Sequence, residues 1–116
     1  MGVVAKLKEF SWADAGNARV LTLGDSKIYA TTINGNNAGS TIVVNGDVTL
    51  SGTTSHAYAT TIKNGKTLKF AAGTFTGTID AENANNGSVV ISADTTIEGV
   101  VGGTKLLAVT VDAGKT

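Results

Sequence analysis

From residue 19 onward, apolar and polar residues alternate in short runs that are separated by turn-forming residues. The runs are rich in Val, Ile and Thr, whose branched side chains suit a pleated and half-buried surface. The alternation predicts an all-β chain. The predicted strands are 20–23, 28–33, 41–44, 48–50, 58–62, 67–70, 74–79, 88–91, 95–97 and 106–111.

Glycine and asparagine mark the boundaries between these runs, because both residues reach positive φ at low cost. Such turns connect hairpins in an antiparallel sheet, and they also form the corners of a β-solenoid. The turns alone therefore leave both architectures open. The sites are Gly24-Asp25, Asn34-Gly35, Asn45-Gly46-Asp47, Asn64-Gly65, Asn86-Gly87 and Gly102-Gly103.

Internal repeats favour the solenoid. The sequence Tyr-Ala-Thr-Thr-Ile at 29–33 returns at 58–62, and the segment 39–52 is echoed by 87–99. Repetition at this period indicates stacked units that each bury an apolar face only against a neighbour. We predict a right-handed parallel β-solenoid of about five irregular coils over residues 16–116. An antiparallel β-sandwich is the alternative.

A trial alignment places the coil cores at five apolar positions with spacings of 21, 26, 22 and 17 residues. These positions are Leu21, Ile42, Leu68, Val90 and Leu107.

The two ends of the chain differ from the middle. Residues 1–15 are predicted to form an N-terminal capping segment, either as a short helix through Val3, Leu7 and Phe10 or as a strand. The pattern of the C-terminal residues 109–116 is that of a strand or turn that is cut off in the middle. We interpret this as a sign of a longer array or of end-to-end assembly, since solenoid ends leave backbone groups unpaired.

Composition narrows the function classes. Only 16 % of residues are charged, the formal net charge is zero and there is no cysteine. The missing basic stripe argues against nucleic acid as a partner, and the missing cysteine excludes disulfides and thiolate sites. No apolar run approaches the about 20 residues of a membrane-spanning helix. The start lacks the apolar region of a signal peptide, so we favour an internal fragment of a longer exported protein.

Candidate catalytic residues are few. His56 is the single histidine, and Ser55 beside it has poor geometry for a catalytic triad. Asp47 and Asp94 would be the candidates for paired-acid glycoside cleavage, or with Asn45 for calcium, if they lay in one column.

Turn roles are the simpler interpretation of these carboxylates, with each Asp bonding its own backbone. The glycine–lysine segments 64–67 and 102–105 also read as turns rather than as phosphate loops. We predict no enzyme activity, no catalytic or metal residues and no cofactor.

Three aromatic residues form a candidate contact surface: Trp12, Tyr29 and Tyr58. Trp12 lies beside Phe10 and is expected to pack in the cap. The two tyrosines occupy equivalent repeat positions, so we expect them to stack in register as an aromatic ladder that stabilises the sheet or presents a surface.

Residues 66–112 resemble the passenger regions of bacterial autotransporters, and most of all the rickettsial surface antigens of the outer membrane protein B type. The likeness is carried by segments 73–80, 86–91 and 95–104. The resemblance implies an exported, surface-displayed β-helix that acts in adhesion or as a surface coat. The chain lacks the membrane translocator of that family, which suits a passenger fragment.

The sequence thus predicts a non-catalytic structural or adhesive scaffold of a bacterial surface-exposed protein, located outside the cell. Its expected partners are a host surface or glycan, or further copies joined through solenoid ends or edges. The alternatives are a self-assembling subunit of a fibre or phage particle, located in a virion, and a carbohydrate-binding or carbohydrate-cleaving β-helix.

Overall fold

The computed structural model describes residues 7–14, 16–37 and 39–116, without the side chains of residues 56–58. These residues form ten strands and no helix. The strands are β1 (Leu7–Ser11), β2 (Val20–Leu23), β3 (Ser26–Asn34), β4 (Thr41–Val44), β5 (Asp47–Ile62), β6 (Thr67–Ala72), β7 (Thr74–Ala81), β8 (Ser88–Ile91), β9 (Thr96–Glu98) and β10 (Ala108–Val111). Every predicted strand is confirmed, and β5 joins two predicted strands by running through two corners.

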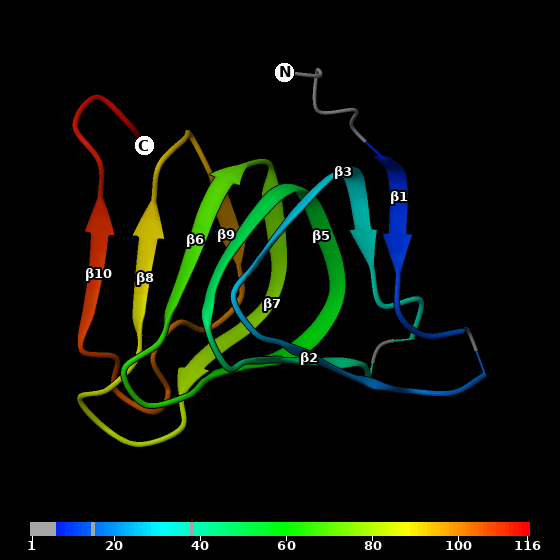
Figure 1. The fold of residues 1–116 in the computed structure, drawn as a ribbon, viewed down its shortest axis with the longest axis horizontal. Coiled ribbons are helices and arrows are strands. Elements are labelled where there is room, and N and C mark those ends of the chain that lie inside the picture. The colour runs from blue at the N-terminus through cyan, green and yellow to red at the C-terminus, as the bar shows by residue number, and fades with distance from the viewer. Residues whose placement is uncertain (1–6, 15, 38) are drawn as a thin grey trace.

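All the strand pairs are parallel, and they build a stack with β1 at one end and β10 at the other (Figure 1). The chain circulates over three faces. Face 1 contains β2, β4, the end of β5, the end of β7 and Val101. Face 2 contains the start of β3, the start of β5, β6, β8 and β10. Face 3 contains β1, the end of β3, the middle of β5, the start of β7 and β9.

Each coil returns to the same face after about 21 residues. On face 2, Val48 pairs with Leu68, Leu68 with Val89 and Val89 with Val109. Parallel pairing between successive coils is the defining feature of a β-solenoid, and an antiparallel β-sandwich is wrong for this chain. The predicted solenoid of about five coils is confirmed.

The core is a set of apolar columns that run along the stack. Alternate residues of each strand point inward, so equivalent positions of successive coils meet in the interior. On face 2 one such column is Ile28, Leu50, Phe70 and Ile91, all buried. Phe70 also packs edge-on against Phe75 of face 3, with ring centroids 5.2 Å apart. The other buried side chains are mostly aliphatic, so the low aromatic content of the sequence is sufficient to fill this narrow core.

Glycine at the corners lets successive coils approach closely. Gly52 and Gly73 have φ of +144° and +89°, and each stands where a Cβ atom would collide with backbone of the preceding coil. Gly52 would meet the carbonyl of Ala30, and Gly73 would meet the carbonyl of Gly52 itself. These glycines lie inside or between predicted strands, so the turn pattern of the sequence did not reveal them.

The trial alignment of coil cores is only partly right. Leu21 does pair with Ile42 on face 1. Ile42, however, continues to Thr60, whereas Leu68 belongs to face 2 and pairs with Val89 rather than with Val90. The alignment mixed two faces because their strands have the same apolar pattern. Leu107 lies just before β10 and is not a core position of its coil.

The repeats in the sequence reflect thirds of a coil. Residues 29–33 lead from face 2 to face 3, and residues 58–62 lead from face 3 to face 1. The shift of 29 residues therefore equals one full coil plus one further strand with its corner. The segment around 39–52 crosses from face 1 to face 2, and 87–99 crosses from face 2 to face 3. The repeating unit is therefore one strand with its corner, and the echoes do not stack on one another.

The start of the described chain is a strand. β1 pairs with β3 in the register Phe10 to Ile33, so the strand alternative of the N-terminal segment holds over residues 7–11. Residues 1–6 and Ala15 lie outside the described residues. The boundary between cap and repeat region at residue 15 stays a prediction.

Candidate interaction surface

The outer side of face 3 carries columns of small polar side chains. One column contains Glu9, Thr32, Thr53, Thr74 and Thr96, and the neighbouring column contains Ser11, Asn34, Ser55, Thr76 and Glu98. The strands lie about 4.8 Å apart, and alternate residues of one strand lie about 6.7 Å apart. All ten residues are exposed or half-buried. We call these two columns the polar face.

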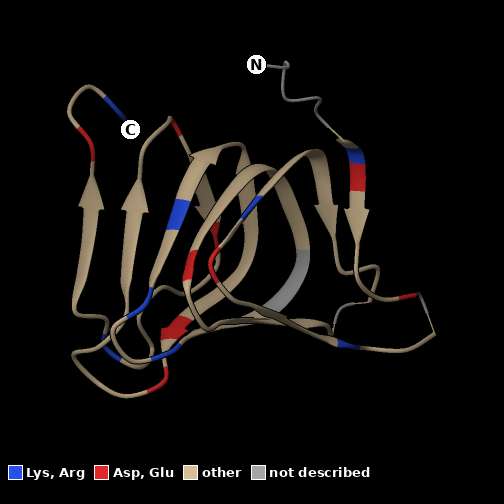
Figure 2. Ribbon diagram, in the orientation of Figure 1, with Lys and Arg blue, Asp and Glu red and all other residues tan. Residues whose placement is uncertain are grey.

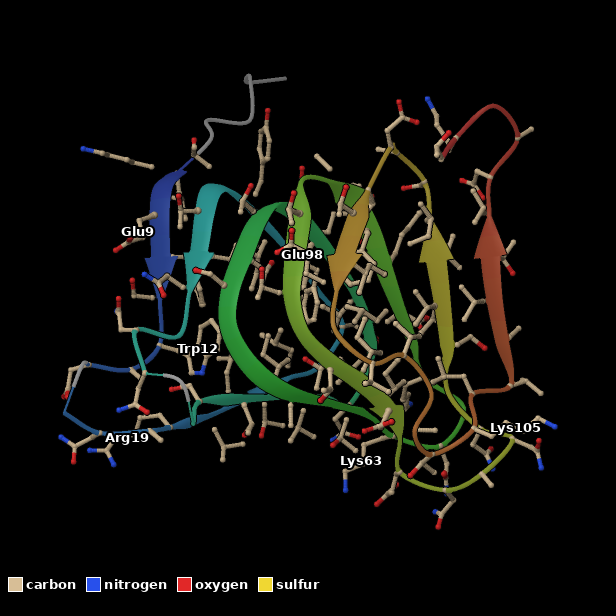
Figure 3. All side chains as sticks on the ribbon, turned by 180° about the vertical axis from the view of Figure 1, so that it is seen from behind. Glu9, Trp12, Arg19, Lys63, Glu98 and Lys105 are labelled. Atoms are coloured by element: carbon tan, nitrogen blue, oxygen red, sulfur yellow. The ribbon has the colours of Figure 1, made fainter. Side chains whose placement is uncertain are left out.

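Three hydrogen bonds link side chains within the polar face. Ser55 Oγ donates to Asn34 Oδ1 at 3.4 Å, and Thr76 Oγ1 donates to Glu98 Oε2 at 3.4 Å, in both cases between successive coils. Ser11 Oγ donates to Glu9 Oε1 at 2.8 Å within β1. The face therefore presents an ordered array of hydroxyl, amide and carboxylate groups. Figure 3 labels Glu9 and Glu98, which belong to β1 and β9.

Three corner carboxylates hold one coil to the next. Asp25 Oδ1 accepts the backbone N–H of Asp47 at 2.8 Å. Asp80 Oδ1 accepts that of Thr104 at 2.9 Å, and Asp94 Oδ1 that of Thr116 at 3.1 Å. Asp14, by contrast, accepts the backbone N–H of Gly16 within its own turn at 2.9 Å. The expectation that Asp94 bonds its own turn is therefore wrong, because its carboxylate accepts the N–H of Thr116 in the following coil.

The candidate acid pair is not assembled. Asp47 begins a strand of face 2, and Asp94 follows the end of β8 on the same face, two coils further along. They stand at opposite corners rather than in one column. Within the described part of the chain, no three His, Asp or Glu side chains gather as metal ligands.

An ion pair crosses from coil to coil at another corner. Lys63 Nζ lies 2.8 Å from Glu82 Oε1, and Asn64 beside it accepts a hydrogen bond from Asn83 Nδ2 at 3.2 Å. The hydrogen bond from Lys63, with its positive charge, holds the pKa of Glu82 below the ordinary value of 4.5. Because both side chains are well exposed, the pair contributes little to stability.

The two glycine–lysine segments are turns, as predicted. In the first, Lys66 N donates to the carbonyl of Lys63 at 3.1 Å. In the second, the N–H of Thr104 is occupied by Asp80, and that of Gly102 donates to Ile79 O at 2.7 Å. A phosphate loop needs free N–H groups at a helix start, and these amides already bind protein oxygens.

The backbone of the three aromatic candidates lies at different places in the stack. Trp12 is half-buried and packs against the core within the N-terminal end of the stack (Figure 3). Tyr29 is 41 % exposed on face 2, where its backbone pairs with Ser51. Tyr58 falls at the corner between faces 3 and 1, so the predicted stacking of Tyr29 on Tyr58 is wrong. The side chains of His56 and Tyr58 lie outside the described residues, and their contact role stays a prediction.

The C-terminal end of the stack exposes core-type residues. Val109 and Val111 of β10 are 52 % and 51 % exposed, although they continue the inward columns of Val89 and Ile91. An open pocket of about 310 Å³ adjoins them, lined by Val101, Gly102, Lys105, Leu106, Leu107, Ala108 and Val109. We call β9, Val101 and β10 the C-terminal end.

Charged residues are scattered over the described surface without a face of one sign (Figure 2). At the corners, Asp25 and Asp80 bind neighbouring backbone, and Lys63 and Glu82 bind each other. Among the described residues, the polar face and the apolar C-terminal end are two surfaces open to solvent.

The fold places the chain in the class of parallel β-solenoids. Comparisons with protein-family models, with curated proteins and with solved structures found no match to this chain. A search of the described residues for a helix long and apolar enough to cross a membrane also found none.

Proposed function

We propose that the chain is a non-catalytic scaffold of a bacterial surface-exposed protein, and that it adheres to a glycan or host surface through its polar face. The observation that carries this proposal is the register that sets mostly hydroxyl groups, with the Asn34 amide and the Glu9 and Glu98 carboxylates, in two columns over the five strands of face 3. Sugars present hydroxyl groups that are bound by fixed side-chain donors and acceptors.

The corner carboxylates support the non-catalytic part of the proposal. Asp25, Asp80 and Asp94 each accept a backbone N–H of the following coil, which gives them a structural role. The surface location comes from the resemblance of residues 66–112 to autotransporter passengers, and it remains part of the proposal.

Binding to a printed panel of neutral glycans and to fixed mammalian cells tests the proposal. A lysine at Thr53 or Thr76 disrupts the centre of the polar face, so T53K and T76K are expected to lower binding about tenfold or more. The matched control is Thr61→Lys, which places the same side chain on the outer side of face 1. Equal binding by all variants, or no binding by the unaltered chain, would count against adhesion through this face.

A further inference from the structure

Asn–Gly pairs lie at corners of the stack, and they differ in what surrounds the glycine. The pairs are 34–35, 45–46, 64–65 and 86–87. An asparagine followed by glycine is open to one covalent reaction, because the glycine nitrogen has no Cβ beside it to keep it from the side-chain amide. The reaction needs that nitrogen to reach Cγ of the asparagine, so the local packing decides which pair reacts.

Three of the pairs are held by contacts between coils. Gly35 is buried, and its N–H donates to Ser55 O at 3.1 Å. Gly46 is buried where a Cβ would collide with backbone of the preceding coil. Gly87 is buried against the side chain of Ile62. These glycine nitrogens cannot swing toward the preceding asparagine side chain without moving one coil away from another.

The pair Asn64–Gly65 lies in an open turn between β5 and β6, and both residues are exposed. Gly65 has a φ of +73°, and nothing lies within 4 Å of the place that a Cβ would take. The turn is closed by a bond from Lys66 N to Lys63 O at 3.1 Å, and the N–H of Gly65 donates to no described oxygen. Figure 3 labels Lys63 at this corner. The turn can therefore rotate the Gly65 nitrogen toward Asn64 without disturbing the stack.

The side chain of Asn64 has its carbonyl oxygen on a hydrogen-bond donor. Asn83 Nδ2, in the following coil, donates to Asn64 Oδ1 at 3.2 Å. A donor on this oxygen draws electron density from Cγ, and it stabilises the negative charge that develops on the oxygen when a nucleophile adds. The leaving group would be Asn64 Nδ2, which takes no part in this bond.

We propose that Asn64 is a site of spontaneous deamidation, in which Gly65 N attacks Asn64 Cγ and expels the side-chain nitrogen as ammonia. The new N–Cγ bond replaces the Cγ–Nδ2 bond, and the amide proton of Gly65 leaves with the ammonia, so that a cyclic succinimide remains. Water then opens the ring. Cleavage of the bond from the ring nitrogen to Cγ gives aspartate, and cleavage of its bond to the backbone carbonyl carbon gives isoaspartate. The net change is one water taken up and one ammonia released.

Deamidation changes this corner in two ways. It places a carboxylate between Lys63 and Lys66 in the sequence, and it lowers the formal net charge by one unit from zero. The new carboxylate competes with Glu82 for Lys63, whose Nζ lies 2.8 Å from Glu82 Oε1. Isoaspartate also adds one carbon to the main chain of the turn. The inference concerns this corner alone and does not depend on the proposed adhesion through the polar face.

Peptide mass spectrometry of the folded chain, aged in mildly alkaline buffer and then digested in acid, tests the proposal. Asn64 is expected to react about tenfold or more faster than the other three asparagines, because their glycine nitrogens are held away from Cγ. These three are Asn34, Asn45 and Asn86. An isoaspartyl methyltransferase assay identifies the isoaspartate product. In urea the four sites should react at similar rates, because the packing that separates them is lost.

A glycine substitution tests the attacking atom. Gly65→Ala adds a methyl group beside the attacking nitrogen and should slow the reaction at Asn64 about tenfold or more. Gly114→Ala is the matched control, since Gly114 also has positive φ and nothing within 4 Å but follows an alanine. The other three asparagines report whether Gly65→Ala stays folded, because unfolding would speed their reaction.

The outcomes separate cleanly. Fast reaction at Asn64 in the folded chain, similar rates in urea and the loss in Gly65→Ala together support the proposal. Equal rates at the four sites of the folded chain, or no reaction at Asn64, would overturn it. A reaction at Asn64 that Gly65→Ala leaves unchanged would overturn the attack by Gly65 N in favour of direct hydrolysis by water. A chain that fails to bind glycans or cells leaves all of these results unaffected.

Discussion

An inner coil and the last coil carry nearly the same residues on face 2, but their burial differs. Val89 and Ile91 of β8 are 0 % and 5 % exposed, whereas Val109 and Val111 of β10 are about half exposed. The two strands are paired in register, so the side chains point the same way. The difference is that β8 has a coil on both sides and β10 on one.

This comparison shows that the apolar side chains of a coil are buried by the coils on either side of it and not by their own coil. A solenoid behaves approximately as a one-dimensional series of coils with nearest-neighbour contacts. At the first coil Phe10 and Trp12 pack partly buried against the core, and at the last coil Ile97 does so while Val109 and Val111 stay about half exposed. Substitutions should therefore cost much inside the stack and little at its last coil.

The largest expected effect is at the glycine corners. Gly52→Ala forces a Cβ into the carbonyl of Ala30 and should destabilise the chain by about 3 kcal/mol or more. Gly114, beyond the last strand, also has positive φ but meets nothing within 4 Å. Gly114→Ala should cost only the about 1–2 kcal/mol of its left-handed backbone. Urea unfolding of both variants would measure the difference, and equal costs would contradict the close approach of coils.

The next largest expected loss of stability is found by comparing Val89 with Val109, which occupy equivalent positions of successive coils. Val89→Ala removes two buried methyl groups and should cost about 2–3 kcal/mol. Val109→Ala should cost about 0.5 kcal/mol or less in dilute solution. Urea unfolding of both variants measures the two costs, and equal costs would contradict the dependence of burial on a following coil.

The strand positions could be predicted from the sequence because alternation of Val, Ile and Thr records which side chains face the core. The register could not, because the three faces share one apolar pattern and Ile42 and Leu68 look equivalent. The echo between 29–33 and 58–62 was a true repeat of one strand with its corner. It suggested a stack of Tyr29 on Tyr58 only because the coil was assumed to be the repeating unit.

The site residues were harder to predict, since their partners come from other coils. Asp94 reads as a turn residue in sequence, yet it accepts the N–H of Thr116, 22 residues away. Likewise, Gly52 and Gly73 are required by a neighbouring carbonyl that no local pattern reveals. The columns of the polar face became visible only once the register set Thr32 beside Thr53.

A smaller effect is expected from two polar residues in the inner core. Thr54 and Thr60 are 1 % exposed, and their hydroxyls have no hydrogen-bond partner among the described residues. An unsatisfied hydroxyl costs about 1 kcal/mol or more, so Thr54→Val and Thr60→Val should each stabilise the chain by about 1 kcal/mol. Thr110→Val on the exposed last strand should change stability by less than about 0.5 kcal/mol. A loss of stability in the inner variants would show that the hydroxyls are bonded.

The smallest effect is the pH dependence of the inner-coil ion pair between Lys63 and Glu82. The pKa of Glu82 is lowered in the folded state, so its contribution to stability is complete above the ordinary value of 4.5. That contribution is lost as the pH falls from about 4.5 through the lower folded pKa. Lys63→Met should move the pKa of Glu82 back toward 4.5, as followed by NMR titration of the carboxyl carbon. An unchanged pKa would mean that the coil-to-coil pair does not persist in solution, because a pair this exposed must also overcome the freedom of both side chains.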